Sequence, residues 1–241
     1  MIVFNISLFL VGILSGGIAS VCGFGIGSFL TPILAFKTGT SIAVAGVSII
    51  HFLGTVFRFW KWKKYINKQV LLTFGLTSAV GGLTGALFHN IFQNSILTVI
   101  FGSLLIFAGF TGLTGISQQW QLKGPTAWLA GALSGIFGGL VGNQGGIRSA
   151  AMFGFELNAK EFVATATGIA LAVDCARMPV YCLTQWREII QIWPFLIFGA
   201  VGVLIGTEMG ILLLSSIPEK LFKRIVSGMI LLIGIFVLIY R

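Results

Sequence analysis

The chain has 241 residues, of which 56% are hydrophobic and 9% are charged, so it lacks the charged surface of a soluble domain. Its net charge of +9 would suit a nucleic-acid-binding protein only if the basic residues formed a free face. Most of them lie instead in short connections between apolar runs, which excludes a nucleic-acid partner and is typical of a membrane protein. The clearest such group is Arg58, Lys61, Lys63, Lys64 and Lys68.

Apolar runs follow one another along the whole chain. A run of about 18 residues or more predicts a helix that crosses a lipid bilayer, so we expect an all-α polytopic membrane protein. The first twenty residues lack a basic leader and a cleavage site, which predicts a retained first helix rather than a signal peptide. The runs cover residues 5–36, 39–57, 69–89, 95–115, 125–153, 159–182, 189–214 and 221–240.

The sequence repeats itself at an offset of 119 residues. Residues 12–58 align without a gap on 131–177 and share eleven identities, among them Gly23 with Gly142 and Arg58 with Arg177. Repeats of this kind are typical of secondary transporters. We therefore predict one transmembrane domain made of two homologous four-segment halves, residues 1–118 and 119–241.

Charge favours an inverted arrangement of these halves. The basic connection lies between runs two and three in the first half, but between runs three and four in the second, at residues 218–224. Inversion requires an odd number of crossings in each half. The first run is long enough for a re-entrant pair of half-helices turning at Gly23, Gly25 and Gly27; a single kinked helix is the alternative.

The glycine-rich breaks near residues 22–27 and 142–146 predict a substrate site. Unwound backbone at membrane depth is tolerated where it lines a cavity, and helix N-termini there favour an anion. Alternatively, the glycines only let helices approach closely. The candidate substrate-binding residues are Cys22, Gly23, Gly25, Gly27, Asn143, Gln144, Gly145, Gly146 and Arg148.

Two of these candidates have a second interpretation each. Arg148 either binds an oxyanion through paired hydrogen bonds or extends to lipid headgroups. Cys22 either contacts a sulfur-containing solute or is a small packing residue.

Ionisable residues inside apolar runs are candidates for ion coupling. Asp174 and Arg177 are three residues apart and therefore share a helical face, where they form either a structural ion pair or a proton-coupling site. His51 lies midway along the second run as a helix-linking or proton-carrying residue. Glu208 is a further candidate acid, and Arg58 is the repeat partner of Arg177 or simply part of the basic connection.

No sequence pattern predicts an enzyme, a cofactor or a metal site. A Walker A motif is absent, and no His, Cys, Asp and Glu residues have the spacing of metal ligands. With two histidines and six acidic residues, the chain has little material for acid–base chemistry.

The stretch from Leu14 to Leu34, with Cys22-Gly23-Phe24-Gly25-Ile26-Gly27 at its centre, resembles the opening motif of the sulfite exporter TauE/SafE family, and so does its echo at 133–146. The resemblance implies transport of sulfur-containing anions, such as sulfite and sulfonates, across the bacterial cytoplasmic membrane. The alternating glycines beside Cys22 and the Asn143-Gln144 pair depart from the family pattern and leave the substrate open.

The leading hypothesis is a secondary transporter of a small, sulfur-containing anion that works by alternating access around the two breaks. Transport would be coupled to protons or driven by the gradient of the solute itself. A channel-like facilitator and a membrane scaffold without a solute pathway are the alternatives. The oligomeric state, including a homo-oligomer, is left open.

Overall fold

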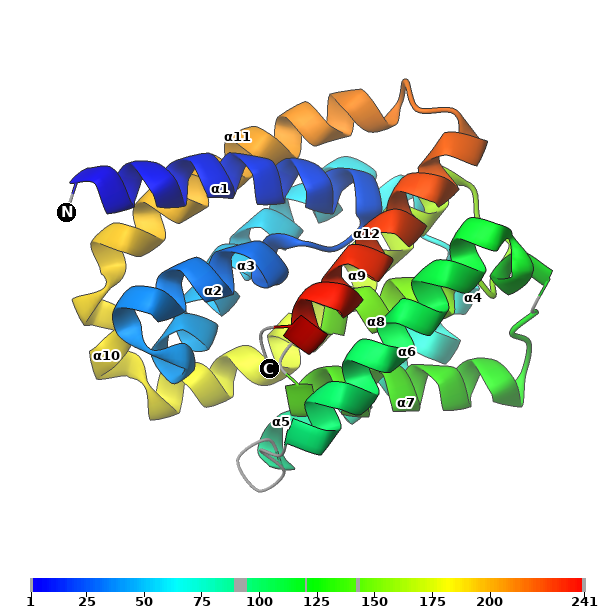
Figure 1. The fold of residues 1–241 in the computed structure, drawn as a ribbon, viewed down its shortest axis with the longest axis horizontal. Coiled ribbons are helices and arrows are strands. Elements are labelled where there is room, and N and C mark those ends of the chain that lie inside the picture. The colour runs from blue at the N-terminus through cyan, green and yellow to red at the C-terminus, as the bar shows by residue number, and fades with distance from the viewer. Residues whose placement is uncertain (1, 89–94, 120, 142–143, 240–241) are drawn as a thin grey trace.

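The computed structural model describes residues 2–88, 95–119, 121–141 and 144–239, and its regular elements there are all helices (Figure 1). Four stretches among these residues are long and apolar enough to cross a membrane. They are α1 (Ile2–Cys22), α11 (Trp193–Leu214), α12 (Glu219–Ile239) and the stretch Ile42–Tyr65, which holds most of α3 (Thr40–Trp62). The expectation that every apolar run forms one full span is therefore too simple.

The first apolar run consists of two helices. α1 ends at Cys22, and α2 (Ile26–Thr38) packs against it while running back toward the end at which the chain begins (Figure 1). Gly23 and Gly25 at the turn have φ angles of 82° and 139°, a region that side chains with a Cβ rarely enter. The fifth run is likewise divided, into α7 (Pro125–Val141) and α8 (Gln144–Met152), which pack together.

Other runs are also interrupted. The seventh run is divided between a short helix, α10 (Trp186–Gln191), and α11. Pro194 lies in the first turn of α11, where its missing N–H is tolerated. The third run contains a π-helical segment, η2 (Leu71–Gly75), just before α5 (Leu76–Phe88). The remaining elements are η1 (Lys63–Tyr65), α4 (Lys68–Val70), η2 (Leu71–Gly75), α5 (Leu76–Phe88), α6 (Ser95–Thr114), η3 (Ile116–Gln119), α9 (Ala159–Thr184) and α10 (Trp186–Gln191).

Three helix pairs pack most extensively: α1 with α11, α5 with α7, and α6 with α12. Glycines allow the close approach in the first two pairs. A Cβ added at Gly206 would overlap the Ile13 carbonyl oxygen, and one added at Gly81 would lie 2.5 Å from the Ala132 carbonyl oxygen. Backbone contact of this kind is how membrane helices associate where burial of apolar surface gives no driving force.

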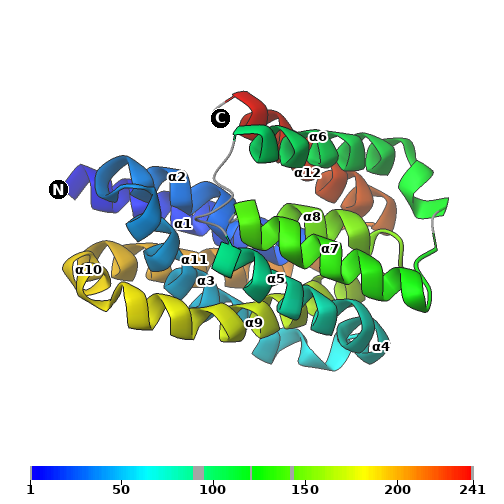
Figure 2. The ribbon, with the colours of Figure 1, turned by 90° about the horizontal axis from the view of Figure 1, so that it is seen from below.

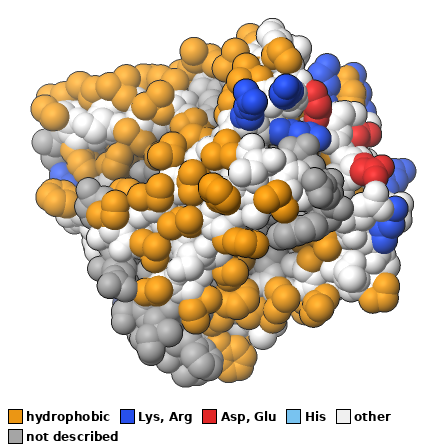
Figure 3. All heavy atoms as spheres, turned by 45° about the vertical axis from the view of Figure 1, so that its right-hand side comes forward, with side chains coloured by type: hydrophobic (Ala, Val, Ile, Leu, Met, Phe, Trp, Pro, Cys, Tyr) orange, Lys and Arg blue, Asp and Glu red, His pale blue; other side chains and the backbone are white. Residues whose placement is uncertain are grey.

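The two longest central helices, α3 and α9, pack against each other and run in opposite directions (Figures 1 and 2). α2 packs on α3, and α8 contacts α9, so both divided runs bring their second helix to this centre. The outer surface is different in character. Figure 3 shows hydrophobic side chains over most of the visible face and charged side chains gathered at one end.

Candidate functional site

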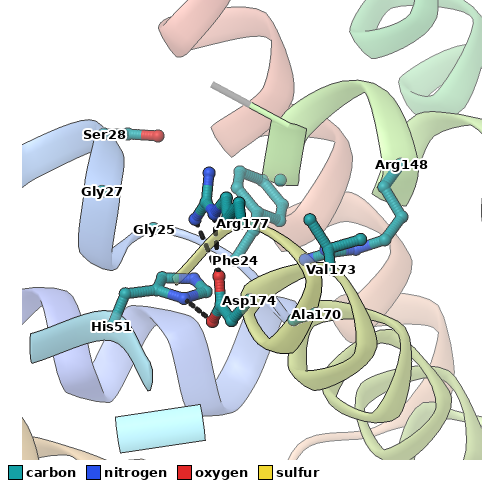
Figure 4. A pocket seen from close by; sticks show the side chains of 11 residues that line it. Phe24, Gly25, Gly27, Ser28, His51, Arg148, Ala170, Val173, Asp174 and Arg177 are labelled. Atoms are coloured by element: carbon teal, nitrogen blue, oxygen red, sulfur yellow. Dashed lines mark hydrogen bonds and ion pairs between the residues drawn. The ribbon is translucent and has the colours of Figure 1, made fainter. Parts of the chain in front are cut away.

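A small open cavity lies between α2, α3, α8 and α9 (Figure 4). Its volume of about 40 Å³ is room for about three water molecules. Helices from both predicted halves contribute to it. The lining residues are Phe24, Gly25, Gly27, Ser28, His51, Gly145, Arg148, Ala170, Val173, Asp174 and Arg177. Seven of them, Gly25, Gly27, His51, Gly145, Arg148, Asp174 and Arg177, are candidates from the sequence.

Asp174 is the centre of the polar network in this cavity. Its Oδ1 accepts hydrogen bonds from Arg177 Nε at 3.1 Å and Nη2 at 2.7 Å, and its Oδ2 lies 2.6 Å from His51 Nδ1 (Figure 4). The carboxylate side chain is 1% exposed, whereas His51 and Arg177 are 15% and 16% exposed. The pairing expected from the spacing of Asp174 and Arg177 is present, and His51 extends it across to α3.

Arg148 approaches the cavity from α8. Its side chain is buried, with the residue 2% exposed, so it does not extend to lipid headgroups. Its Nη2 donates a hydrogen bond of 3.4 Å to the Gly23 carbonyl oxygen, at the turn between α1 and α2. Its Nε has no hydrogen-bond partner among the described residues. One arginine thus connects the two divided runs and keeps a free donor.

The glycines at the breaks have two different surroundings. Gly27 lines the cavity, and a Cβ added there would find no atom within 4 Å. Gly145 also lines the cavity, but a Cβ there would lie 2.6 Å from Phe24 Cβ, and one at Gly23 would lie 3.0 Å from Ala166 Cβ. Close packing therefore explains Gly23 and Gly145, while Gly27 borders open space.

Several sequence candidates lie elsewhere or cannot be placed. Cys22 is buried in the core at the end of α1 and does not line the cavity. Gly146 faces Leu105 instead of the cavity. Asn143 lies outside the described residues; α8 begins at Gln144, whose side chain is not described. Glu208 forms a partly exposed ion pair of 3.0 Å with Lys61, away from this site.

The sequence left two roles open for Arg58, as the repeat partner of Arg177 or as part of the basic connection. Arg58 is fully buried, and its Nη2 donates a long hydrogen bond of 3.4 Å to Thr55 Oγ1, which in turn lies 3.4 Å from His51 Nδ1. It is therefore an extension of the polar network along α3. The alignment of Arg58 with Arg177 across the repeat was the available signal.

No group of three or more His, Cys, Asp and Glu side chains within the described ranges could hold a metal ion. What this arrangement offers chemically is a set of fixed guanidinium donors around one carboxylate and one imidazole. Such a set suits recognition of an oxyanion.

The sulfite exporter TauE/SafE family model matches residues 8–237, almost the whole chain. A probable membrane transporter protein of Methanocaldococcus jannaschii is 24% identical over 253 residues, covering 96% of this chain and 94% of the relative. No solved structure is significantly similar to the chain. Together with the apolar helices, the match makes this a multi-pass membrane protein. The chain belongs to the sulfite exporter TauE/SafE family of membrane transporters.

Proposed function

We propose that the protein is a secondary transporter that moves small, sulfur-containing anions of the sulfite or sulfonate type through the cavity by alternating access. The observation that carries this proposal is the burial of Arg148 at the cavity with one donor unpaired. A guanidinium that is 2% exposed and has an unpartnered Nε is costly to bury unless a ligand completes its hydrogen bonds. The size of the cavity, about 40 Å³, is in keeping with a small solute.

Backbone dipoles add to the preference for an anion. Gly25 caps the N-terminus of α2, and Gly145 lies in the first turn of α8; both line the cavity. The N-terminal ends of these two helices therefore face the solute with the partial positive charge of the helix dipole. The same geometry gives the broken helices of other transporters their affinity for anionic groups.

Alternating access would follow from two inverted halves. In the repeat, α1 corresponds to α7, and α11 corresponds to α5. In support of related halves, α1 packs on α11 and, in the same way, α7 packs on α5. The glycines at both contacts recur in the sequence: Gly81 and Gly85 resemble Gly202 and Gly206. The counterparts α3 and α9 run antiparallel (Figure 1). Each of these tight pairs joins one helix from either half. Rocking of such helix pairs against one another would then expose the cavity to each side in turn.

The charged end of the molecule supports an orientation in a bacterial cytoplasmic membrane. Lys64 and Lys160 both lie over the Tyr65 ring, and the Ala159 N–H donates to Glu219 Oε2. Basic connections from both halves therefore meet at one end, which the positive-inside rule assigns to the cytoplasm. The His51–Asp174 contact supports coupling to protons, because the imidazole can gain or lose a proton beside the carboxylate.

Flux measurements on purified protein in liposomes test the proposal. Sulfite, thiosulfate, sulfoacetate and taurine are each followed with and without a pH gradient. The matched pair Gly27→Leu and Gly228→Leu tests the cavity, because a Cβ at either glycine meets no atom within 4 Å but only Gly27 lines the site. We expect Gly27→Leu to lower flux at least tenfold and Gly228→Leu to leave it unchanged.

Folded protein that moves none of these anions would refute anion transport. Equal flux through Gly27→Leu and the wild type would remove the cavity from the pathway. Flux that does not respond to the pH gradient would leave the His51–Asp174 contact with a purely structural role.

A further inference from the structure

The buried charges of this molecule do not balance. All six acidic residues of the chain lie among the described residues, and Asp174 is the only one that is buried. Arg58 and Arg148 are buried with it, and Arg177 lies against it with a side chain that is 16% exposed. Three guanidinium groups thus share one carboxylate, which leaves an excess of two positive charges. Protonation of His51 would only increase that excess.

Two of these arginines have donors without a partner in the described structure. They are Nε of Arg148 and both Nε and Nη1 of Arg58. An isolated buried charge is expensive, and its cost is reduced only by an opposite charge and by hydrogen bonds to the remaining donors. Arginine stays protonated in proteins, so loss of a proton does not relieve the excess.

Arg58 belongs to the same electrostatic site although it does not line the cavity. It lies seven residues beyond His51 on α3, about 10 Å along the helix axis. Its side chain returns toward the cavity through Thr55, and its charge acts on those of both Arg148 and Asp174. A negative group in the cavity would therefore be attracted by Arg58 as well as by the lining arginines.

We propose that the site selects doubly charged anions over singly charged ones, and that Arg58 supplies one of the two charges that hold them. The inference rests on the proposed function and narrows its substrate class to dianions, such as sulfate-like oxyanions or a sulfonate that carries a second acidic group. At about 10 Å and an effective dielectric constant of about 20, one guanidinium changes the affinity for each anionic charge roughly tenfold.

Binding of matched anions to the purified, detergent-solubilised protein tests this selection. Sulfate is compared with methanesulfonate, and sulfoacetate with its methyl ester, at constant ionic strength by isothermal titration calorimetry. Each pair keeps a sulfur oxyanion and removes one negative charge. We expect each dianion to bind at least tenfold more tightly than its singly charged partner.

Arg58→Gln, which removes the charge, should lower this ratio roughly tenfold, whereas Arg58→Lys should retain most of it. Lys61→Gln is the control, because it also removes a cation from α3. The Lys61 side chain is 45% exposed, so its charge is screened by water. The ratio should not change in that variant.

The outcomes separate the selection from the transport proposal. If the wild type binds both members of each pair equally, dianion selection is wrong while anion transport stands; if it binds none of the four, the evidence for an anion site fails as well. An unchanged ratio in folded Arg58→Gln would remove Arg58 from the site. Should that variant not fold, the wild-type ratio still decides the selection, and Arg58→Lys decides whether the position matters.

Discussion

The carboxylate of Asp174 should stabilise the fold far more than any other acidic group of the protein. It is 1% exposed and accepts hydrogen bonds from Arg177 and His51. Asp174→Asn keeps the shape of the side chain but removes the charge and places amide hydrogens against existing donors. Breaking a buried ion pair from one side costs about 3–5 kcal/mol, because the remaining charge stays buried without a partner.

For a chain of this length, each kcal/mol shifts the melting temperature by about 2–4 °C. Asp174→Asn should therefore lower the apparent melting temperature by roughly 6–20 °C. The measurement is size-exclusion chromatography of detergent-solubilised protein after heating. Glu208→Gln is the control, because it breaks a pair with Lys61 in which both side chains are more than 40% exposed. Exposed pairs contribute about 0–1 kcal/mol, so the shift should stay within about 4 °C.

Sulfate should restore stability more strongly in Asp174→Asn than in the wild type, since the variant leaves three guanidinium groups without a carboxylate. A melting temperature for Asp174→Asn no lower than that of Glu208→Gln would refute the reasoning. It would mean that the carboxylate is not held in the buried network that the structure places around it.

Gly206→Ala should lower thermal stability by about 1–3 kcal/mol or more, because the added Cβ would overlap a backbone carbonyl of α1; Gly228→Ala should be neutral or slightly stabilising. Gly23→Ala should be destabilising by about 1–2 kcal/mol through its φ of 82°, and equal stability to the wild type would contradict the turn. Cysteines placed at Lys64 and Lys220 should both be labelled from the same side of the membrane, and labelling from opposite sides would refute the inverted arrangement.

Much of the fold was accessible from the sequence because lipid imposes simple rules. Consecutive apolar runs of about 18 residues or more predict helices across the bilayer, and the glycines at the first break mark where a run too long for one crossing turns back. The ends of the helices were harder to predict. Pro194 starts α11 inside an apolar run, and hydropathy alone does not register such a boundary.

The candidate site divides in the same way. By itself, the sequence determined the family, the breaks, and the pairing of Asp174 with Arg177, since that pair is separated by one helical turn. Only the tertiary structure decided that His51 contacts this pair, that Arg148 lines the same cavity and that Cys22 does not. Those positions depend on how the helices pack. Burial likewise distinguished Arg58 from the neighbouring lysines. The sequence shows which residues are charged, but their exposure to water depends on the tertiary structure.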